Sequence, residues 1–259
     1  MKIAVVQMDI EFGQPEKNFA KVEKYTEEAA KNHTDVIIFP EMWNTGYALK
    51  QLESLADADG IHTKELFSKL AKKYHVNIVG GSVATKNQDK FYNTMYIADR
   101  TGMIISEYSK AHLFKLMDEH QYMNAGHKLN TFELDGITCG GVICYDLRFP
   151  EWIRSHVLRG AKIMFIPAEW PTPRIDHWQI LLQARAIENQ CFVVAVNRVG
   201  SDPGNTFNGH SMVIAPWGEL LISGHTEEGI YYTDINLQEV DSVRSTIPIF
   251  QDRRTDLYN

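Results

Sequence analysis

Residues 137–167 read ITCGGVICYDLRFPEWIRSHVLRGAKIMFIP, and this stretch decides the fold class. The runs at 137–144 and 162–167 are apolar and rich in β-branched residues, which is typical of buried strands. The segment between them, from Pro150 to Leu158, is expected to form a helix. Strand, helix and strand in direct succession are the pattern of an α/β fold.

The same alternation continues on both sides of this stretch. Helices are expected after Pro15, because the first turn of a helix tolerates proline, and over residues 63–74 and 176–188. Strands are expected at residues 2–8, 35–40, 77–84, 191–197, 212–215, 220–223 and 230–235.

One segment departs from this alternation. Residues 92–98 and 103–108 flank Asp99-Arg100-Thr101-Gly102, and Gly102 can adopt the positive φ of a tight turn. The pattern predicts an antiparallel hairpin, so the sheet is expected to be mixed. No linker or repeat divides the chain, which predicts one domain over residues 1–259. The polar segment 241–259 is expected to reach a partner subunit.

The composition excludes several classes of function. The 259 residues are 44% apolar and 23% charged, carry a net charge of −7 and show no cluster of Lys and Arg. Such a chain is not expected to bind nucleic acid or an anionic membrane surface, and a small-molecule substrate is favoured. No apolar run approaches the roughly 20 residues of a membrane span. Asp9 interrupts the first apolar run too early for a signal peptide.

The three cysteines, Cys139, Cys144 and Cys191, have neither zinc-ligand spacing nor the even number of a disulfide framework. We therefore expect a reduced, cytoplasmic protein that binds no metal. Cys139 and Cys191 lie within apolar strands and are assigned to packing.

Three predicted strands end at residues that can carry chemistry. Glu41 follows the run 36–40, Lys110 follows 104–109, and Cys144 follows 141–143. Because sites in α/β sheets form beyond the carboxyl ends of strands, these three side chains are expected to meet in one crevice.

Each of the three residues suits a different role. Cys144, at a turn before a helix, is the candidate nucleophile, and nearby backbone N–H groups are expected to favour its thiolate. Glu41 lies among apolar residues that would raise its carboxyl pKa, which suits a general base. Lys110 would stabilise an oxyanion. The alternatives are a core cysteine, a structural glutamate and a solvated lysine.

The three candidates lie in longer motifs: FPE at 39–41, KAHLF at 110–114 and GVICYDLRFPE at 141–151. Together these motifs resemble the signature regions of the nitrilase superfamily of carbon–nitrogen hydrolases. The resemblance implies a four-layer α-β-β-α sandwich that forms a homodimer, with Glu41, Lys110 and Cys144 as the catalytic triad. Glu119, nine residues after Lys110, matches the second family glutamate, which supports the lysine.

Further segments narrow this resemblance. Residues 110–126, AEWPTPRIDHW at 168–178 and ARAIENQ at 184–190 resemble bacterial ω-amidases of the 2-oxoglutaramate amidase type. The resemblance implies a cofactor-free amidohydrolase that forms a thioester on its cysteine. Its substrates would be ω-amides of small 2-oxo dicarboxylic acids, such as 2-oxoglutaramate and 2-oxosuccinamate, and its products the acid and ammonia.

Four residues are expected to contact this substrate. The backbone N–H of Tyr145 would bind the oxyanion, and Arg174 would pair with the distal carboxylate. Trp170 is expected to line the pocket, and His177 to donate a hydrogen bond beside it. Arg148 is the alternative cation.

Other functions stay open at this point. An N-carbamoyl amino-acid amidohydrolase or a nitrilase would use the same triad with a different pocket. A catalytically idle binding protein of this fold is a second alternative. A thiol redox enzyme is disfavoured because no resolving cysteine neighbours Cys144. A Cys–His dyad is a further arrangement, although no histidine lies in a recognisable catalytic pattern and His112, His177 and His210 can equally be supporting hydrogen-bond donors.

Overall fold

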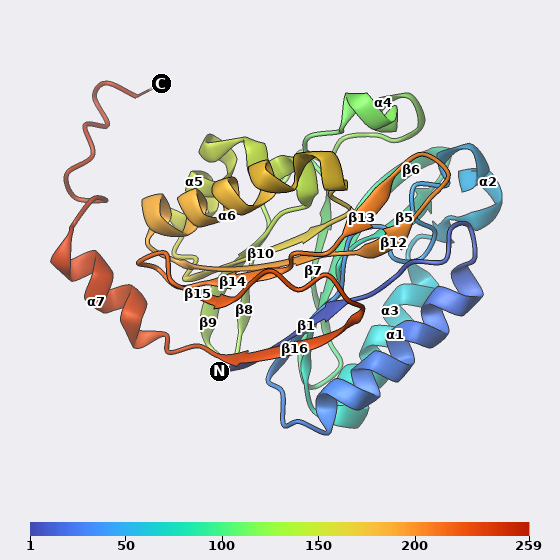
Figure 1. The fold of residues 1–259 in the computed structure, drawn as a ribbon, viewed down its shortest axis with the longest axis horizontal. Coiled ribbons are helices and arrows are strands. Elements are labelled where there is room, and N and C mark those ends of the chain that lie inside the picture. Colours follow the sequence, from blue (N-terminus) through green and yellow to red (C-terminus); the bar gives the residue numbers. More distant parts are fainter. Residues whose placement is uncertain (259) are drawn as a thin grey trace.

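The computed structural model describes residues 1–258, which form two facing β-sheets with helices on their outer sides (Figure 1). The first sheet consists of β1 (Lys2–Gln7), β2 (Val36–Ile38), β3 (Asp57–Ala58), β4 (Asn77–Val79), β5 (Val83–Asn87), β6 (Lys90–Ala98), β7 (Ile104–Ser109) and β16 (Gly229–Asp234). The second consists of β8 (Thr131–Leu134), β9 (Ile137–Gly141), β10 (Ile163–Ala168), β11 (Phe192–Asn197), β14 (Met212–Ile214) and β15 (Leu220–Ile222). Strands β12 (Val199–Ser201) and β13 (Thr206–Asn208) pair as a separate ribbon.

Both sheets are mixed, as the sequence predicts. The first has the order β16-β1-β2-β4-β6-β5-β3, with β7 paired to β6. Strands β1, β2 and β4 are parallel, whereas β6 is antiparallel to both β4 and β7. The β6–β7 hairpin is confirmed, and Gly102 in its turn has φ +90°. The second sheet has the order β15-β14-β11-β10-β9-β8, with β9, β10 and β11 parallel.

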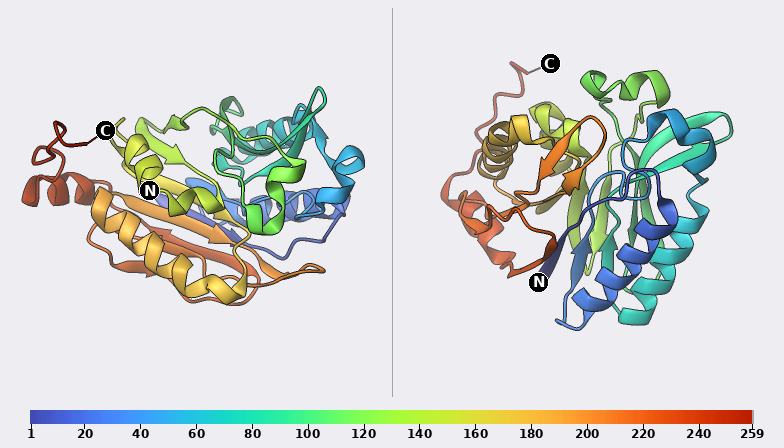
Figure 2. Two further views of the ribbon diagram at one scale, coloured as in Figure 1. Left: turned by 90° about the horizontal axis from the view of Figure 1, so that it is seen from above. Right: turned by 45° about the vertical axis from the view of Figure 1, so that its right-hand side comes forward.

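Helices cover the outer face of each sheet (Figure 2). The helices in the described part of the chain are α1 (Pro15–Ala30), α2 (Leu52–Leu55), α3 (Ile61–Tyr74), α4 (Glu119–Tyr122), α5 (Pro150–Val157), α6 (Ile175–Asn189) and α7 (Gln238–Thr246). Helices α1 and α3 pack on the first sheet, and α5 and α6 on the second. Within residues 1–258, no helix has both the length and the apolar character needed to cross a membrane.

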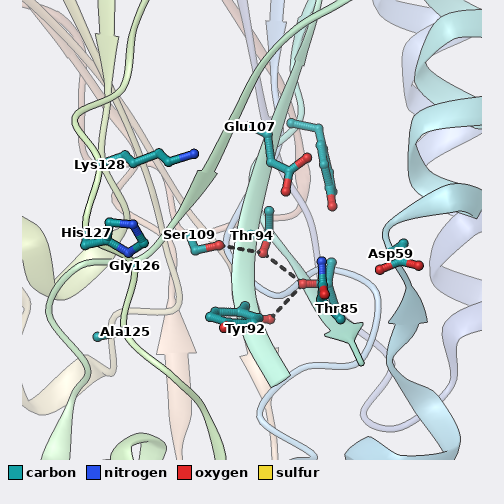
Figure 3. A pocket seen from close by; sticks show the side chains of 12 residues that line it. Asp59, Thr85, Tyr92, Thr94, Glu107, Ser109, Ala125, Gly126, His127 and Lys128 are labelled. Atoms are coloured by element: carbon teal, nitrogen blue, oxygen red, sulfur yellow. Dashed lines mark hydrogen bonds between the residues drawn. The ribbon is translucent and has the colours of Figure 1, made fainter. Parts of the chain in front are cut away.

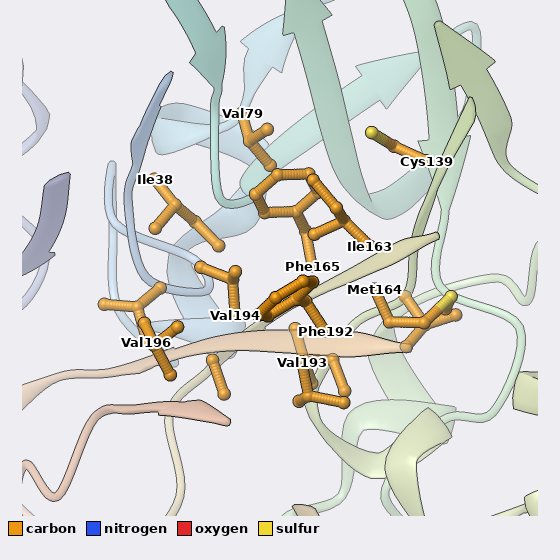
Figure 4. Close-up of a cluster of buried hydrophobic side chains, with 14 of the residues drawn as sticks. Ile38, Val79, Cys139, Ile163, Met164, Phe165, Phe192, Val193, Val194 and Val196 are labelled. Carbon is orange, nitrogen blue, oxygen red and sulfur yellow. The ribbon is translucent and has the colours of Figure 1, made fainter. Parts of the chain in front are cut away.

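Alternation along the strands produces the layers. On β1, Ile3 and Val5 face the second sheet, whereas Ala4 and Val6 face α1 and α3. Figure 4 shows the inter-sheet core, where Ile38 of β2 lies near Val194 of β11. Burying one such side chain contributes about 1.5–3 kcal/mol, so the pattern of period two holds the sheets together. The four-layer α-β-β-α sandwich is confirmed.

The C-terminal segment forms more structure than its polar sequence suggests. Helix α7 buries Val240 and Val243, although the sequence predicts a polar tail over residues 241–259. After it, Phe250 lies against two guanidinium groups of its own chain, those of Arg154 and Arg244, each 5.1 Å from the ring centroid. Part of the apolar patch near Pro248 is therefore covered within the subunit.

The expected strand over 77–84 is wrong in its middle. It divides into β4 and β5 at Gly80 and Gly81, where the backbone of Gly81 has φ +59°. A Cβ at Gly81 would lie 2.0 Å from the carbonyl oxygen of Pro40, the residue before Glu41. Only glycine fits this left-handed position beside another backbone, so the break seats the loop that carries Glu41.

We predict that Gly81→Ala lowers the free energy of unfolding by more than about 3 kcal/mol, because it combines positive-φ strain with a backbone clash. Gly136 has φ +77°, and a Cβ added there would meet no heavy atom within 4 Å, so Gly136→Ala is the matched control. That control should cost about 1–2 kcal/mol from strain alone. Denaturant unfolding of both variants measures the difference, and equal losses would contradict the proposed clash.

Candidate active site

Carboxyl ends of strands from both sheets meet at one edge of the sandwich. Strands β2 and β7 run in the same direction in the first sheet, and Glu41 and Lys110 follow them. Cys144 follows β9 in the second sheet. The structure brings these three residues together, because the faces of the two sheets pack on each other with these ends aligned.

The Lys110 ammonium lies between two carboxylates. Its Nζ is 2.8 Å from Oε1 of Glu41 and 2.8 Å from Oε2 of Glu119. It also donates to the hydroxyl of Tyr47 at 3.1 Å. All three charged side chains are fully buried. Removing one member of such a buried ion pair typically costs about 3–5 kcal/mol, because the other charge loses its partner.

Glu41 is held from several directions. Its Oε1 accepts hydrogen bonds from Tyr47 Oη and Asn93 Nδ2, both at 2.8 Å, besides the bond from Lys110. Its Oε2 accepts the backbone N–H of Glu169 at 2.8 Å. Asn93 also donates to Glu119 at 3.0 Å, so the two carboxylates share one amide. The carboxyl group can therefore exchange a proton without changing its position.

Burial and charge set the protonation states of this cluster. Desolvation lowers the pKa of Lys110, but Glu119 and Glu41 outweigh it and hold that pKa above its ordinary value. Desolvation raises the pKa of Glu119, and Lys110 opposes the rise. Burial raises the pKa of Tyr47 well above its ordinary value, and the neighbouring Glu119 adds to this. Lys110 is thus a permanent cation and Tyr47 a neutral donor.

Cys144 lies on a strained turn. It begins the short 3₁₀ segment Cys144–Arg148 with φ +45°, which is uncommon for a residue other than glycine. Asp146 fixes this turn, since its carboxylate accepts the N–H of Ile143 at 3.0 Å and the hydroxyl of Tyr108 at 2.7 Å. The other Asp146 oxygen accepts the N–H of His112 at 2.9 Å. Hydrogen bonds from separate segments of the fold therefore support the strained position.

The expectation that the position of Cys144 favours its thiolate over the thiol is wrong. Desolvation raises the pKa of its thiol well above the ordinary value, and the negative charge of Glu41 raises it further. Lys110 lowers this pKa but does not outweigh them. With 5% of its surface exposed, Cys144 gains too little solvation to ionise alone. The thiol needs a base at the moment of attack, and Glu41 is a neighbouring carboxylate whose charge acts on this thiol.

A small cavity of about 10 Å³, roughly the room that one water molecule needs, opens beside Cys144. Its lining consists of Phe114, Cys144, Tyr145, Arg148, Glu169, Trp170, Pro171 and Arg174. The guanidinium of Arg148 lies 4.8 Å from the Trp170 ring centroid, and that of Arg174 lies 5.5 Å from the ring of Phe114. Trp170 Nε1 donates to the carbonyl of Arg174 at 2.7 Å, which ties the two lining segments together. Two cations and a thiol thus share one small cavity.

The predicted substrate contacts fall into two groups. Tyr145, Trp170 and Arg174 line the cavity, and so does the alternative cation Arg148. His177 is exposed and does not line the cavity; its Nδ1 lies 3.3 Å from Nη2 of Arg148. The cluster also contains residues that sequence reasoning missed, namely Tyr47, Asn93 and Glu169. Only Glu169 has a signal in the sequence, since a carboxylate at the end of an apolar strand repeats the pattern of Glu41.

A larger groove lies on the opposite side of the first sheet (Figure 3). Its floor includes Thr94 of β6, whereas the neighbouring Asn93 faces Glu41 and Glu119. Successive residues of a strand point to opposite faces, so the groove and the carboxylate cluster lie on different faces of the sheet. Within residues 1–258, no group of three or more His, Cys, Asp or Glu side chains is arranged to hold a metal ion.

Comparison with known proteins agrees with this geometry. The profile of the Carbon-nitrogen hydrolase family matches residues 2–245. The chain is 55% identical over 256 residues to the 2-oxoglutaramate amidase of Bacillus subtilis (strain 168), covering 99% of this chain and 98% of that protein. It is 30% identical over 266 residues to human Omega-amidase NIT2, covering 99% of this chain and 96% of that one.

A solved structure gives the same result for the fold. The CN-hydrolase superfamily protein XC1258 from Xanthomonas campestris, which has an arsenic adduct in its active site, superposes with a TM-score of 0.91 at 30% identity. The match covers 98% of this chain and 97% of that chain. The chain therefore belongs to the carbon–nitrogen hydrolase family, and it is an enzyme of the class that hydrolyses amides.

We predict that iodoacetamide alkylates Cys144 slowly at neutral pH and ever faster up to pH 9 and beyond, without a plateau below that pH. The reason is that the pKa of the thiol is raised, so the reactive thiolate forms only in alkali. Peptide mapping separates Cys144 from the buried Cys139 and Cys191. A rate that already levels off near pH 7 would show a resting thiolate and contradict this account.

Proposed function

We propose that this chain is an ω-amidase that hydrolyses the ω-amide of small 2-oxo dicarboxylic acids, such as 2-oxoglutaramate and 2-oxosuccinamate, through a thioester on Cys144. The observation that carries the proposal is one cavity lined by Cys144 together with Arg148 and Arg174, directly beside the buried Glu41–Lys110 pair. Similarity over the whole chain to a bacterial 2-oxoglutaramate amidase supports the same substrate class.

Acylation begins with proton transfer from Cys144 to Glu41. The sulfur attacks the amide carbonyl carbon, and the carbonyl oxygen becomes an oxyanion. Lys110 and the backbone N–H of Tyr145 stabilise that charge. The C–N bond then breaks as Glu41 returns its proton to the nitrogen, and ammonia leaves.

In deacylation the same carboxylate again acts first as a base and then as an acid. Glu41 takes a proton from a water molecule, whose oxygen attacks the thioester carbonyl. The C–S bond breaks, and the proton passes to the sulfur, which restores the thiol and releases the acid. No cofactor enters either step, since every proton and electron pair is accounted for by substrate, water and side chains.

The N–H groups of the Lys110 ammonium already donate hydrogen bonds within the protein. One of these bonds must break before Lys110 can donate to the oxyanion. Two of its partners, Glu41 and Glu119, are carboxylates, whereas the third, Tyr47, is a neutral hydroxyl at the longer distance of 3.1 Å. The bond to Tyr47 is the weakest and is the one released. Glu119 keeps the ammonium in place during the exchange, so it acts as a positioning residue.

The distal carboxylate of the substrate would pair with a guanidinium in the cavity. Arg174 follows Trp170 and Pro171 in the lining, and a guanidinium can bind a carboxylate through two parallel hydrogen bonds. Arg148 lines the same cavity, so the substrate meets two cations at that end. This charge favours a substrate with a free carboxylate over a simple nitrile or a neutral amide.

We further propose that the enzyme is a cytoplasmic homodimer in which the segment 241–259 contacts the partner subunit. Three free cysteines support a reducing compartment. The exposed Ile247, Leu257 and Tyr258 support a contact made by this segment.

Substitutions in the triad test the chemical roles. We predict that Cys144→Ala abolishes ammonia release from 2-oxoglutaramate. Glu41→Gln and Lys110→Ala should each lower kcat by at least about 100-fold, since one oxyanion donor alone contributes about 3–4 kcal/mol. KM should change much less. A variant whose loss lies wholly in KM would show that its residue binds the substrate and takes no part in the chemical step.

The two arginines are distinguished by substrate. Arg174→Ala should lower kcat/KM for 2-oxoglutaramate, because the substrate carboxylate loses its partner. The loss corresponds to about 2–5 kcal/mol of transition-state free energy. A short monoamide without that carboxylate should be affected far less. Arg148→Ala on the same pair of substrates is the matched comparison. If Arg174→Ala lowers kcat/KM equally for both substrates, Arg174 is a structural residue. Arg148 then becomes the candidate that binds the substrate carboxylate.

A further inference from the structure

Glu169 is another buried carboxylate beside the nucleophile. The steps above give it no role. It follows β10, is 1% exposed and lines the cavity together with Cys144. Its backbone N–H holds Glu41 at 2.8 Å. Its side chain therefore lies at the reacting end of the cavity, next to the general base.

One oxygen of this carboxylate has no partner. Oε2 accepts a hydrogen bond from Nη1 of Arg198 at 3.1 Å, whereas Oε1 is buried and bonds to nothing among residues 1–258. Buried acceptors are almost always satisfied, so an unpaired one in a ligand cavity indicates a donor that the ligand supplies.

The cavity lining also carries charges of both signs. Arg148 and Arg174 provide cations, whereas Glu169 provides a carboxylate next to Cys144. A substrate with an anionic end and an N–H donor end fits this polarity in one orientation only. An ω-amide of a dicarboxylic acid is such a molecule, because its carboxylate is anionic and its amide nitrogen carries two N–H groups.

We infer that Glu169 is a specificity residue that recognises the amide NH₂ group, with Oε1 accepting one of its N–H bonds. The inference rests on the proposed function and deepens it. The same carboxylate disfavours the reaction product, because hydrolysis replaces the NH₂ donor with a negatively charged oxygen. Glu169 thus selects an amide over the corresponding acid and helps the acid to leave.

Arg198 prepares Glu169 for this task. It is fully buried and donates to Glu169 through Nη1 and to Asp9 through Nη2 at 3.0 Å. Burial raises the pKa of Glu169 to about 8, and Arg198 opposes that rise. A substrate N–H bonded to Oε1 lowers this pKa, so Glu169 becomes the ionised acceptor when the amide binds.

The test replaces the acceptor with a donor of the same shape. In Glu169→Gln, the amide oxygen can still accept from Arg198, which turns the NH₂ group toward the cavity. Two donors then face each other when the substrate binds, so kcat/KM for 2-oxoglutaramate should fall about 10- to 100-fold. The inhibition constant of 2-oxoglutarate, the dicarboxylate product, should instead decrease, because its new oxygen meets a donor.

Opposite changes in the two constants support the inference. A variant whose cavity is merely damaged would bind both molecules more weakly, so a fall in kcat/KM with an unchanged or increased inhibition constant overturns it. Asp9→Asn is the matched control, since it removes the other carboxylate from Arg198 without touching the cavity, and both constants should stay within about threefold of wild type. If wild-type enzyme releases no ammonia from 2-oxoglutaramate, the proposed substrate fails instead, which is a separate outcome.

Discussion

The buried ammonium of Lys110 is the constraint on which the rest of the site depends. A charge with no access to water is tolerated only when opposite charges and hydrogen bonds surround it. Glu41 and Glu119 supply those charges, each 2.8 Å from the ammonium. Asn93, on the strand next to β7, donates hydrogen bonds to both carboxylates. The segments after β2 and β7, the N-terminal half of β6 and the start of α4 must therefore meet at one point for the chain to fold.

This arrangement also explains why a neutral thiol is used. Burial raises the pKa of Cys144, and the negative charge of Glu41 raises it further although the Lys110 cation lies nearby. Ionisation of the sulfur is then coupled to proton transfer to Glu41. A thiol that ionises only during attack is protected from oxidation and alkylation while no substrate is present.

Much of the fold and the centre of the site could be predicted from the sequence, for identifiable reasons. The strands before Glu41 and Cys144 are continuous apolar runs, and Lys110 follows the second strand of a hairpin whose turn is marked by Gly102; both signals show in the sequence alone. The break at Gly81 was missed because it depends on contact with the backbone of Pro40, 41 positions away. Tyr47 and Asn93 were missed for the same reason. Their roles arise from positions across the sheet, and neither lies in an unusual local pattern.

The central claim is that Cys144 becomes acylated during turnover. Acid quenching during the first turnover of 2-oxoglutaramate, followed by intact mass measurement and peptide mapping, tests it most directly. The account predicts an adduct with the mass of the substrate less that of ammonia, located on the peptide that contains Cys144 and absent from those with Cys139 and Cys191. Continued ammonia release with no adduct on Cys144 at any quench time would contradict it, and would mean that water attacks the amide directly.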